Sequence, residues 1–108
     1  MSVEVWSEGS YYHGCFKEGV KHGQGLYYWA DGSSYSGEWD NDEMSGFGHF
    51  QWADGRQFQG EFRQGIFDGY GIYEWPDGRK YEGNYVQNFK SGFGVYIYSD
   101  GSRYEGDW

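Results

Sequence analysis

The sequence predicts an all-β fold, a single antiparallel sheet of consecutive β-hairpins. Aromatic-glycine-aromatic segments recur every 23 residues, and their first residues are Tyr12, Tyr35, Phe58, Tyr81 and Tyr104. Asp-Gly pairs and GxG triplets keep the same spacing, and no glycine-free segment carries the i, i+3, i+4 apolar pattern of a helix. A fixed period of this length is typical of a repeat array. We therefore expect residues 1–108 to form one array.

The composition indicates what the core of this array is made of. Of the 108 residues, 24% are aromatic, and the formal net charge is −9. Few aliphatic residues and a high charge are typical of disorder, but aromatic side chains bury large areas with few rotatable bonds. Most of the aromatic residues follow the 23-residue register. A single repeat cannot bury such a face alone, so each repeat must stack on its neighbours.

One repeat contains two strands and two turns in order along the chain. The first strand runs from Tyr35 to Trp39, and a polar loop follows from Asp40 to Ser45. The second strand starts near Gly46 and ends at Trp52. Asp54-Gly55 then turns the chain into the next repeat, because glycine accepts positive φ and aspartate bonds its own backbone. We expect about ten strands spanning about 43 Å, at roughly 4.8 Å per strand.

Glycine in the middle of the first strand requires an explanation, because it normally weakens a strand. Gly37 lies between Tyr35 and Trp39 on the same predicted face. If GxG glycines lie opposite the aromatic residues of the first strand, each ring gains a flat floor on the neighbouring backbone. This hypothesis assigns Gly37 a structural role rather than a catalytic one.

These motifs resemble those of the MORN repeat family over essentially the whole chain, from about Val3 to Trp108. The third copy, FQGEFRQGIFDGYGIYEWPDG at residues 58–78, and the His-Gly pair at His22 are similar to the family pattern. The resemblance implies an elongated, twisted and curved sheet whose groove binds protein segments. Phosphoinositide binding has also been proposed for the family. Both ends of the chain fall within a repeat, so we expect a segment of a longer protein.

The residues argue against catalysis, and we predict no catalytic residue, no metal site and no cofactor. Four acidic residues belong to turns, and most others take outward positions as solvated charge. The GxG triplets lack the strand-to-helix context that phosphate binding needs. His13, His22 and His49 occupy three different positions of the repeat, so they do not form a recurring site. His22 is replaced by serine or aspartate in the later copies.

The single cysteine and the absence of a signal peptide or long apolar run predict a cytoplasmic protein. The resemblance adds a possible place in a cytoskeletal, axonemal or ciliary assembly. Cys15 takes an outward position, where we expect a free surface thiol. The chain has only 8 basic residues and 17 acidic ones. This balance argues against nucleic acid and against anionic membranes, both of which recruit clustered lysine and arginine.

We predict a protein-interaction scaffold that binds a helical or extended, basic segment along its aromatic face. More aromatic surface is in register than one uncovered sheet can bury, and exposed aromatic patches mark binding sites. The expected central contacts are Trp29, Tyr35, Trp39, Phe50, Trp52, Phe58, Tyr73, Trp75 and Tyr81. An acidic rim should attract the basic partner and speed its encounter. Its expected residues are Glu38, Asp40, Asp42, Glu43, Glu61 and Asp68.

Two further hypotheses concern other partners. The alternative function is binding to phosphoinositides or a membrane surface through Lys17, Lys21 and Lys90. The end segments, Val3–Trp6 and Tyr104–Trp108, should each lack a partner strand on one side and carry neither proline nor lysine. Open edges of this kind pair with other chains, so end-to-end self-association is a further prediction.

Overall fold

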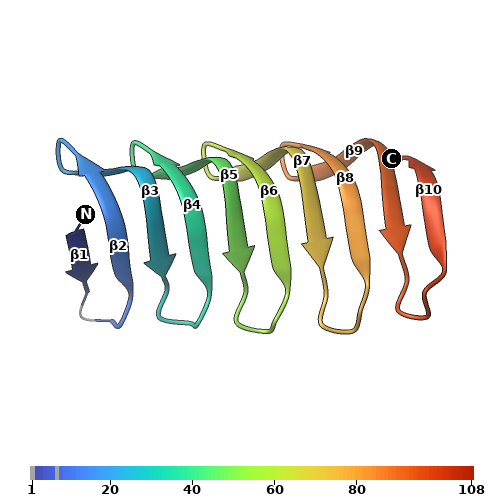
Figure 1. Cartoon of the computed structure of the whole chain (residues 1–108), viewed down its shortest axis with the longest axis horizontal. Coiled ribbons are helices and arrows are strands. Elements are labelled where there is room, and N and C mark those ends of the chain that lie inside the picture. Colours follow the sequence, from blue (N-terminus) through green and yellow to red (C-terminus); the bar gives the residue numbers. More distant parts are fainter. Residues whose placement is uncertain (1, 7) are drawn as a thin grey trace.

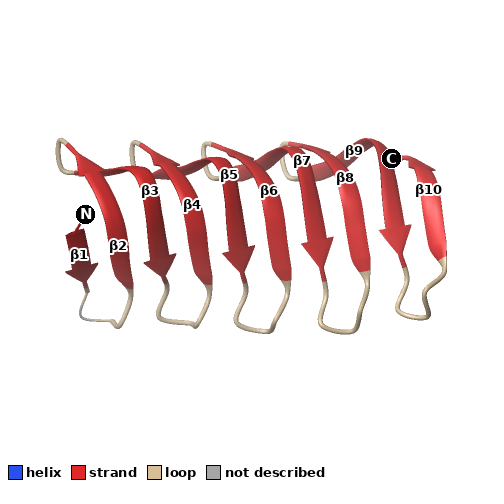
Figure 2. Cartoon of the chain, in the orientation of Figure 1, coloured by secondary structure: helices blue, strands red, loops and turns tan. Residues whose placement is uncertain are grey.

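The chain forms one open, ten-stranded antiparallel sheet in which each strand pairs only with its neighbours in sequence (Figure 1). The computed structural model describes residues 2–6 and 8–108. Within these residues there are strands, turns and loops but no helix (Figure 2). The strands are β1 (Ser2–Val5), β2 (Tyr11–Lys17), β3 (Val20–Tyr28), β4 (Ser34–Asp40), β5 (Glu43–Gln51), β6 (Gln57–Arg63), β7 (Ile66–Glu74), β8 (Lys80–Val86), β9 (Phe89–Ile97) and β10 (Arg103–Asp107).

The predicted fold class is confirmed, and so is the predicted length. The molecule measures 46 × 24 × 17 Å along its principal axes, against the expected span of about 43 Å. Successive hairpins lie side by side along the long axis, with one set of turns at each end of the strands (Figure 1). The sheet has a single layer, so only side chains of the sheet itself can shield one of its faces from solvent.

The Asp-Gly turns hold one set of hairpin ends closed through the same contacts in each repeat. The N–H of Trp29 donates to the carbonyl of Ser33 at 2.9 Å, and the carboxylate of Asp31 accepts from the Ser33 N–H at 2.9 Å. Hydrogen bonds from the hydroxyl and N–H of Ser33 lower the pKa of Asp31. Gly32 takes a φ of 96°, a conformation that glycine adopts without strain. The predicted turn chemistry is therefore present.

A bulge bends the second strand of the repeat at its GxG triplet. Gly37 pairs with Gly48 and Glu38 pairs with Ser45, so two residues of β5 have no partner on β4. One of them, Gly46, has a φ of 62°. The other is Phe47, whose N–H donates to the side-chain carboxylate of Glu38 at 2.9 Å. The carboxylate replaces the missing strand partner, and the bulge increases the local bend and twist.

The glycines form the floor on which the aromatic rings lie, and their pairing agrees with the prediction in part. The first glycine of a triplet lies opposite an aromatic residue of the next first strand, as Gly46 does with Phe62, whereas Gly48 lies opposite Gly37. The Tyr35 ring lies across both, because a Cβ added to Gly48 would be 2.2 Å from the Tyr35 hydroxyl oxygen. That hydroxyl donates to the Glu38 carbonyl at 3.0 Å. Two adjacent glycines are therefore needed for each ring, since one ring spans two strands.

These rings form the core, on the face of the sheet that we call the inner face. Tyr35 and Phe58 are fully buried, and both contact Phe62 with their rings nearly perpendicular. Edge-to-face pairs of this kind add stability beyond the area they bury. The buried core residues are Tyr12, Tyr35, Trp39, Phe58, Phe62, Tyr81 and Tyr85. The opposite face of the sheet is the outer face.

The buried tyrosines predict that the fold is lost in alkali. Burial raises the pKa of Tyr12, Tyr35, Tyr81 and Tyr85, because the phenolate form is poorly solvated in the core. Their contribution to stability is fully present below the pKa of the unfolded chain, about 10, and is lost as the pH rises toward the higher folded values. We expect the melting temperature to fall steadily above about pH 10, measured by circular dichroism.

The variant Tyr35→Phe provides the control for this experiment, since Phe58 already fills the same place without a hydroxyl. Its melting temperature should depend less steeply on pH in the alkaline range than that of the wild type. Equal slopes for the two proteins would contradict the assignment of the alkaline transition to the buried phenols.

Candidate functional site

A continuous row of aromatic rings, most of them tilted against their neighbours, follows the inner face along the length of the molecule. Each complete repeat contributes two rings to this row. Strand alternation directs the first, near the end of a strand, to the inner face, and the second follows two residues later in the turn. Consecutive ring centroids are 4.4–5.9 Å apart. The rings are half-buried, except for Tyr98, which is 46% exposed. We call this row the aromatic ladder: Trp6, Tyr27, Trp29, Phe50, Trp52, Tyr73, Trp75, Tyr96 and Tyr98.

Two arginines lie over the central indole rings of the ladder. The guanidinium carbon of Arg56 is 5.0 Å from the ring centroid of Trp52, and that of Arg79 is 4.9 Å from the Trp75 ring. Arg56 also donates to Asp54 at 2.8 Å. Each guanidinium is therefore held by a cation–π contact and by a turn aspartate. The ladder consequently presents aromatic surface flanked by arginines whose charge is already paired.

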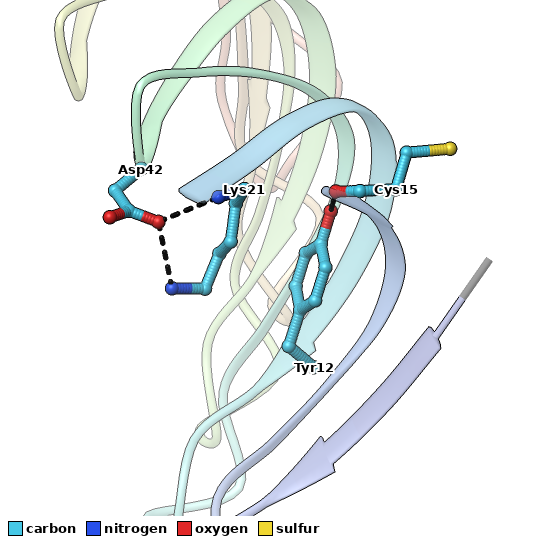
Figure 3. A network of polar contacts seen from close by, with 4 residues as sticks. All are labelled: Tyr12, Cys15, Lys21 and Asp42. Carbon is cyan, nitrogen blue, oxygen red and sulfur yellow. Dashed lines mark hydrogen bonds and ion pairs between the residues drawn. The ribbon is translucent and has the colours of Figure 1, made fainter. Parts of the chain in front are cut away.

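Lys21 covers the first part of the inner face (Figure 3). Its ammonium nitrogen lies 5.3–5.7 Å from the centroids of four rings, including Tyr12 and Trp39. Asp42 accepts from the Lys21 N–H at 2.8 Å and from the ammonium at 3.4 Å (Figure 3). The backbone hydrogen bond from Lys21 lowers the pKa of Asp42. With a side chain only 15% exposed, Lys21 is part of the fold.

The structure divides the predicted contact residues into two groups. Five belong to the ladder and are half-buried, so they retain surface for a partner: Trp29, Phe50, Trp52, Tyr73 and Trp75. The others lie in the core. Tyr35, Phe58 and Tyr81 have no exposed surface, and Trp39 is 6% exposed. The rings of Tyr35, Phe58 and Tyr81 lie on glycine pairs, and Trp39 packs edge-on against Tyr35. These four rings therefore support the surface and have almost no area of their own for direct contact.

The predicted acidic rim does not border the aromatic ladder. Glu38 adjoins the inner-facing Trp39 in β4, so strand alternation turns it to the outer face. There it accepts the Phe47 N–H, and Glu61 accepts the Tyr70 N–H at 3.3 Å. The same alternation directs Asp40, Glu43 and Asp68 outward. Asp42 is bound to Lys21. The expected acidic border of the aromatic face is therefore corrected: most of these carboxylates belong to the other face or its loops.

Two hollows adjoin the turn between β4 and β5. One, of about 320 Å³, is lined by Asp40, Glu43, Arg63 and neighbouring residues. The second, of about 400 Å³, includes Lys17, His22 and Asp40. The Nδ1 atom of His22 lies 3.4 Å from a carboxylate oxygen of Asp40. The hollows are thus lined by mixed charges, and neither includes a residue of the ladder.

The three lysines of the predicted lipid site do not form one patch. Lys17 is exposed on the outer side of β2, whereas Lys21 is buried against aromatic rings. Lys90 lies on the inner side of β9, with its ammonium 5.2 Å from the Tyr81 ring centroid. Strands β3 and β9 are six positions apart in the sheet, which corresponds to about 29 Å. Lys17 alone offers an uncommitted charge.

In the part of the chain that the structure describes, no group of three or more histidine, cysteine, aspartate or glutamate residues could hold a metal ion. Residues 2–6 and 8–108 include no helix long and apolar enough to cross a membrane. Cys15 is a free, half-buried cysteine. Strands β1 and β10 lie at the edges of the sheet as expected, and their self-association stays a prediction.

Three exposed aromatic side chains on the outer face were not predicted as site residues. Phe47 is 61% exposed, Tyr70 45% and Phe93 58%. Each is the central residue of a GxG triplet. Both their 23-residue spacing and their outward direction, set by strand alternation from the inward-facing Phe50 and its equivalents, are visible in the sequence. The bulge beside them is not.

The one-layered sheet of hairpins and its aromatic ladder define an open repeat scaffold. Four consecutive segments, residues 12–34, 35–55, 58–78 and 81–103, match the family model of the MORN repeat. The chain therefore belongs to the MORN repeat family. These repeats are known as protein- and membrane-interaction modules, and the fold is generally non-enzymatic. Comparison with curated proteins gives no significant match.

Proposed function

We propose that this protein is a non-catalytic scaffold that binds a helical or extended segment of another protein along the aromatic ladder. The observation that carries this proposal is a line of nine rings that keep exposed area on a sheet without a second layer. Half-exposed indole and phenol rings in one line are typical of interaction surfaces, because aromatic residues dominate binding energy.

The chemistry of the ladder favours an apolar partner surface there. Arg56 and Arg79 are already paired with Asp54 and Asp77 at 2.8 and 2.9 Å. Their positive charges are thus largely compensated, and most residues of the expected acidic rim lie on the outer side. The segment bound to the ladder should therefore contribute apolar and aromatic side chains, instead of the basic ones expected from composition. A molecule 46 Å long has room for about 30 residues of helix.

The membrane-lipid alternative has weaker support. Binding to an anionic surface needs several uncommitted basic residues close together, whereas Lys21 and Lys90 are held over aromatic rings. A place in the cytoplasm, in a cytoskeletal or ciliary assembly, is part of the proposal and rests on the family resemblance and the single cysteine. Imaging of the tagged protein in ciliated cells tests it.

The double variant Trp52→Tyr, Trp75→Tyr tests the proposed binding site. Tyr98 occupies the same place in the last repeat, so tyrosine is compatible with the ladder. The substitutions reduce ring area at its centre, and we expect at least about a tenfold loss of affinity for a partner retrieved by the wild-type array. Affinity is measured by titrating the purified partner, and folding by circular dichroism.

The matched control is Tyr11→Phe, Tyr28→Phe, which alters an aromatic pair stacked at 5.3 Å outside the ladder. This variant should keep the wild-type affinity. Equal affinities for the wild type and the ladder variant would place the binding site elsewhere. If the intact array retrieves no specific partner from extracts of several tissues, the scaffold function itself is rejected.

A further inference from the structure

A second linear surface crosses the outer face, on the other side of the sheet from the aromatic ladder. It contains one residue from each strand from β4 to β10, and the residue from β8 is Asn84. Phe47 pairs directly with Glu61, Tyr70 with Asn84, and Phe93 with Asp107. The row therefore runs perpendicular to the strands. We call it the outer strip, and its other residues are Glu38, Phe47, Glu61, Tyr70, Phe93 and Asp107.

The strip alternates rings with polar side chains, three of which are carboxylates. Its rings are more exposed than those of the ladder other than Tyr98. Phe47, Tyr70 and Phe93 are 45–61% exposed. Glu38 and Glu61 are fixed in place, because each accepts the N–H of the next ring-bearing residue along the row. The strip thus has an ordered charge pattern held by the bulges.

We propose that the outer strip docks a basic amphipathic helix whose apolar and basic residues alternate at heptad a and d positions. Neighbouring strands are about 4.8 Å apart, close to the 5.4 Å rise of one helical turn. Equivalent residues two strands apart repeat at about 10 Å, and seven helical residues rise about 10.5 Å. A helix lying along the strip would place each a residue against a ring and each d residue against a carboxylate.

Arginine suits the d positions better than any other residue. Its guanidinium can pair with a carboxylate and stack on the adjacent ring at the same time. Glu61 lies between Phe47 and Tyr70, so one arginine can reach both kinds of group. Asn84 replaces the carboxylate in the next repeat, so the matching helix position should be polar rather than charged.

Charge also decides between the possible occupants. The strip contains three carboxylates and no basic residue, and the whole chain has a formal net charge of −9. A second copy of this chain, a nucleic acid or an anionic membrane would bring like charge to this row. A basic helix brings the opposite charge. Because the strip and the ladder lie on opposite faces, two segments can be bound at once.

The test uses two synthetic 18-residue peptides titrated into the isotopically labelled array and followed by NMR. The first carries leucine at a and arginine at d. The second has the same composition but an order that destroys the heptad period. The first peptide should shift the amide signals of Phe47, Tyr70 and Phe93, leave the Trp52 and Trp75 indole signals in place, and bind at least tenfold more tightly than the second.

Two sets of variants locate the interaction. The variant Glu38→Gln, Glu61→Gln keeps an acceptor for each bulge N–H but removes two charges, and it should weaken binding at least fivefold at low salt. The matched control Glu18→Gln, Glu43→Gln removes two exposed charges outside the strip and should have less than a twofold effect. The variant Phe47→Ser, Tyr70→Ser should abolish detectable binding while folding is preserved.

Three results would overturn the proposal. The two peptides could bind equally, which would make the heptad period irrelevant. The indole signals of the ladder could shift instead of the strip amides. Finally, both charge variants could weaken binding to the same extent, which would indicate a general effect of net charge. None of these results argues against binding of a partner by the ladder, so this proposal can fail while the proposed function stands.

Discussion

Replacing Phe58 with alanine should lower the free energy of unfolding by about 4 kcal/mol, the usual range for a large aromatic residue removed from a core. Phe58 has no exposed surface, and its ring stacks on Phe67 with centroids 3.9 Å apart. It also meets the edges of Phe62 and Tyr85. Alanine would leave a cavity between repeats that the glycine floor cannot fill. Urea unfolding followed by fluorescence measures the change.

Phe47→Ala is the matched control for this experiment. It removes the same atoms from a side chain that is 61% exposed, so the expected change is within about 0.5 kcal/mol. Similar losses in both variants would mean that burial does not distinguish the two rings. Because repeats are stabilised by their neighbours, hydrogen exchange in Phe58→Ala should increase most in β6 and β7.

The second large effect is expected from Gly48→Ala, with a loss of about 3 kcal/mol. The added methyl carbon would lie 2.2 Å from the Tyr35 hydroxyl oxygen and 2.4 Å from its ring carbon Cε1. The ring would have to leave its place on the glycine floor. Gly78→Ala is the comparison: no atom lies within 4 Å there, and only its φ of 96° opposes a side chain. That strain costs about 1 kcal/mol. Thermal and urea unfolding provide both values.

A double-mutant cycle separates the steric clash from other effects of Gly48→Ala. In a Tyr35→Ala background the ring is absent, so the same substitution at Gly48 should cost much less than in the wild type. If the two costs are equal, the methyl group destabilises the strand for a reason unrelated to Tyr35, and the role assigned to the glycine pair is incorrect.

The fold could be predicted from the sequence because its determinants are local and recur. Asp54-Gly55 and its equivalents mark each hairpin, and the aromatic-glycine-aromatic segments mark every first strand. The depth of each ring could not be predicted in the same way. Tyr35 and Trp52 are both aromatic and both in register, yet Tyr35 is fully buried and Trp52 half-buried. The difference depends on which ring lies across two adjacent glycines, a property of strand pairing.

The candidate site shows the same division between local and non-local information. Alternation within β4 alone places Glu38 and Trp39 on different faces, so the outward direction of Glu38 follows from the sequence. Alternation within β5 likewise directs Phe47 outward, because Met44 and Phe50 pack against the core. The bulge next to it, in which Gly46 takes positive φ, could not be predicted in this way. Bulges depend on the register of two strands, and strict alternation along one strand does not reveal them.

Lys21, Met44, Phe67 and Lys90 occupy the same position in successive repeats and form a row on the inner face. This row affects which alignment a bound partner adopts. A regular array offers the same contacts after a slide of one repeat, about 10 Å, so a bound segment would have several equivalent alignments. The inner-face residues at the position of Lys21 differ along the chain: Met44 and Phe67 join the aromatic packing, whereas Lys90 again places an ammonium over a ring. A segment with apolar groups matched to the middle of this row would meet a lysine after any slip. The variation between repeats thus disfavours alignments that are shifted by one repeat in either direction. It selects one alignment on an otherwise periodic surface.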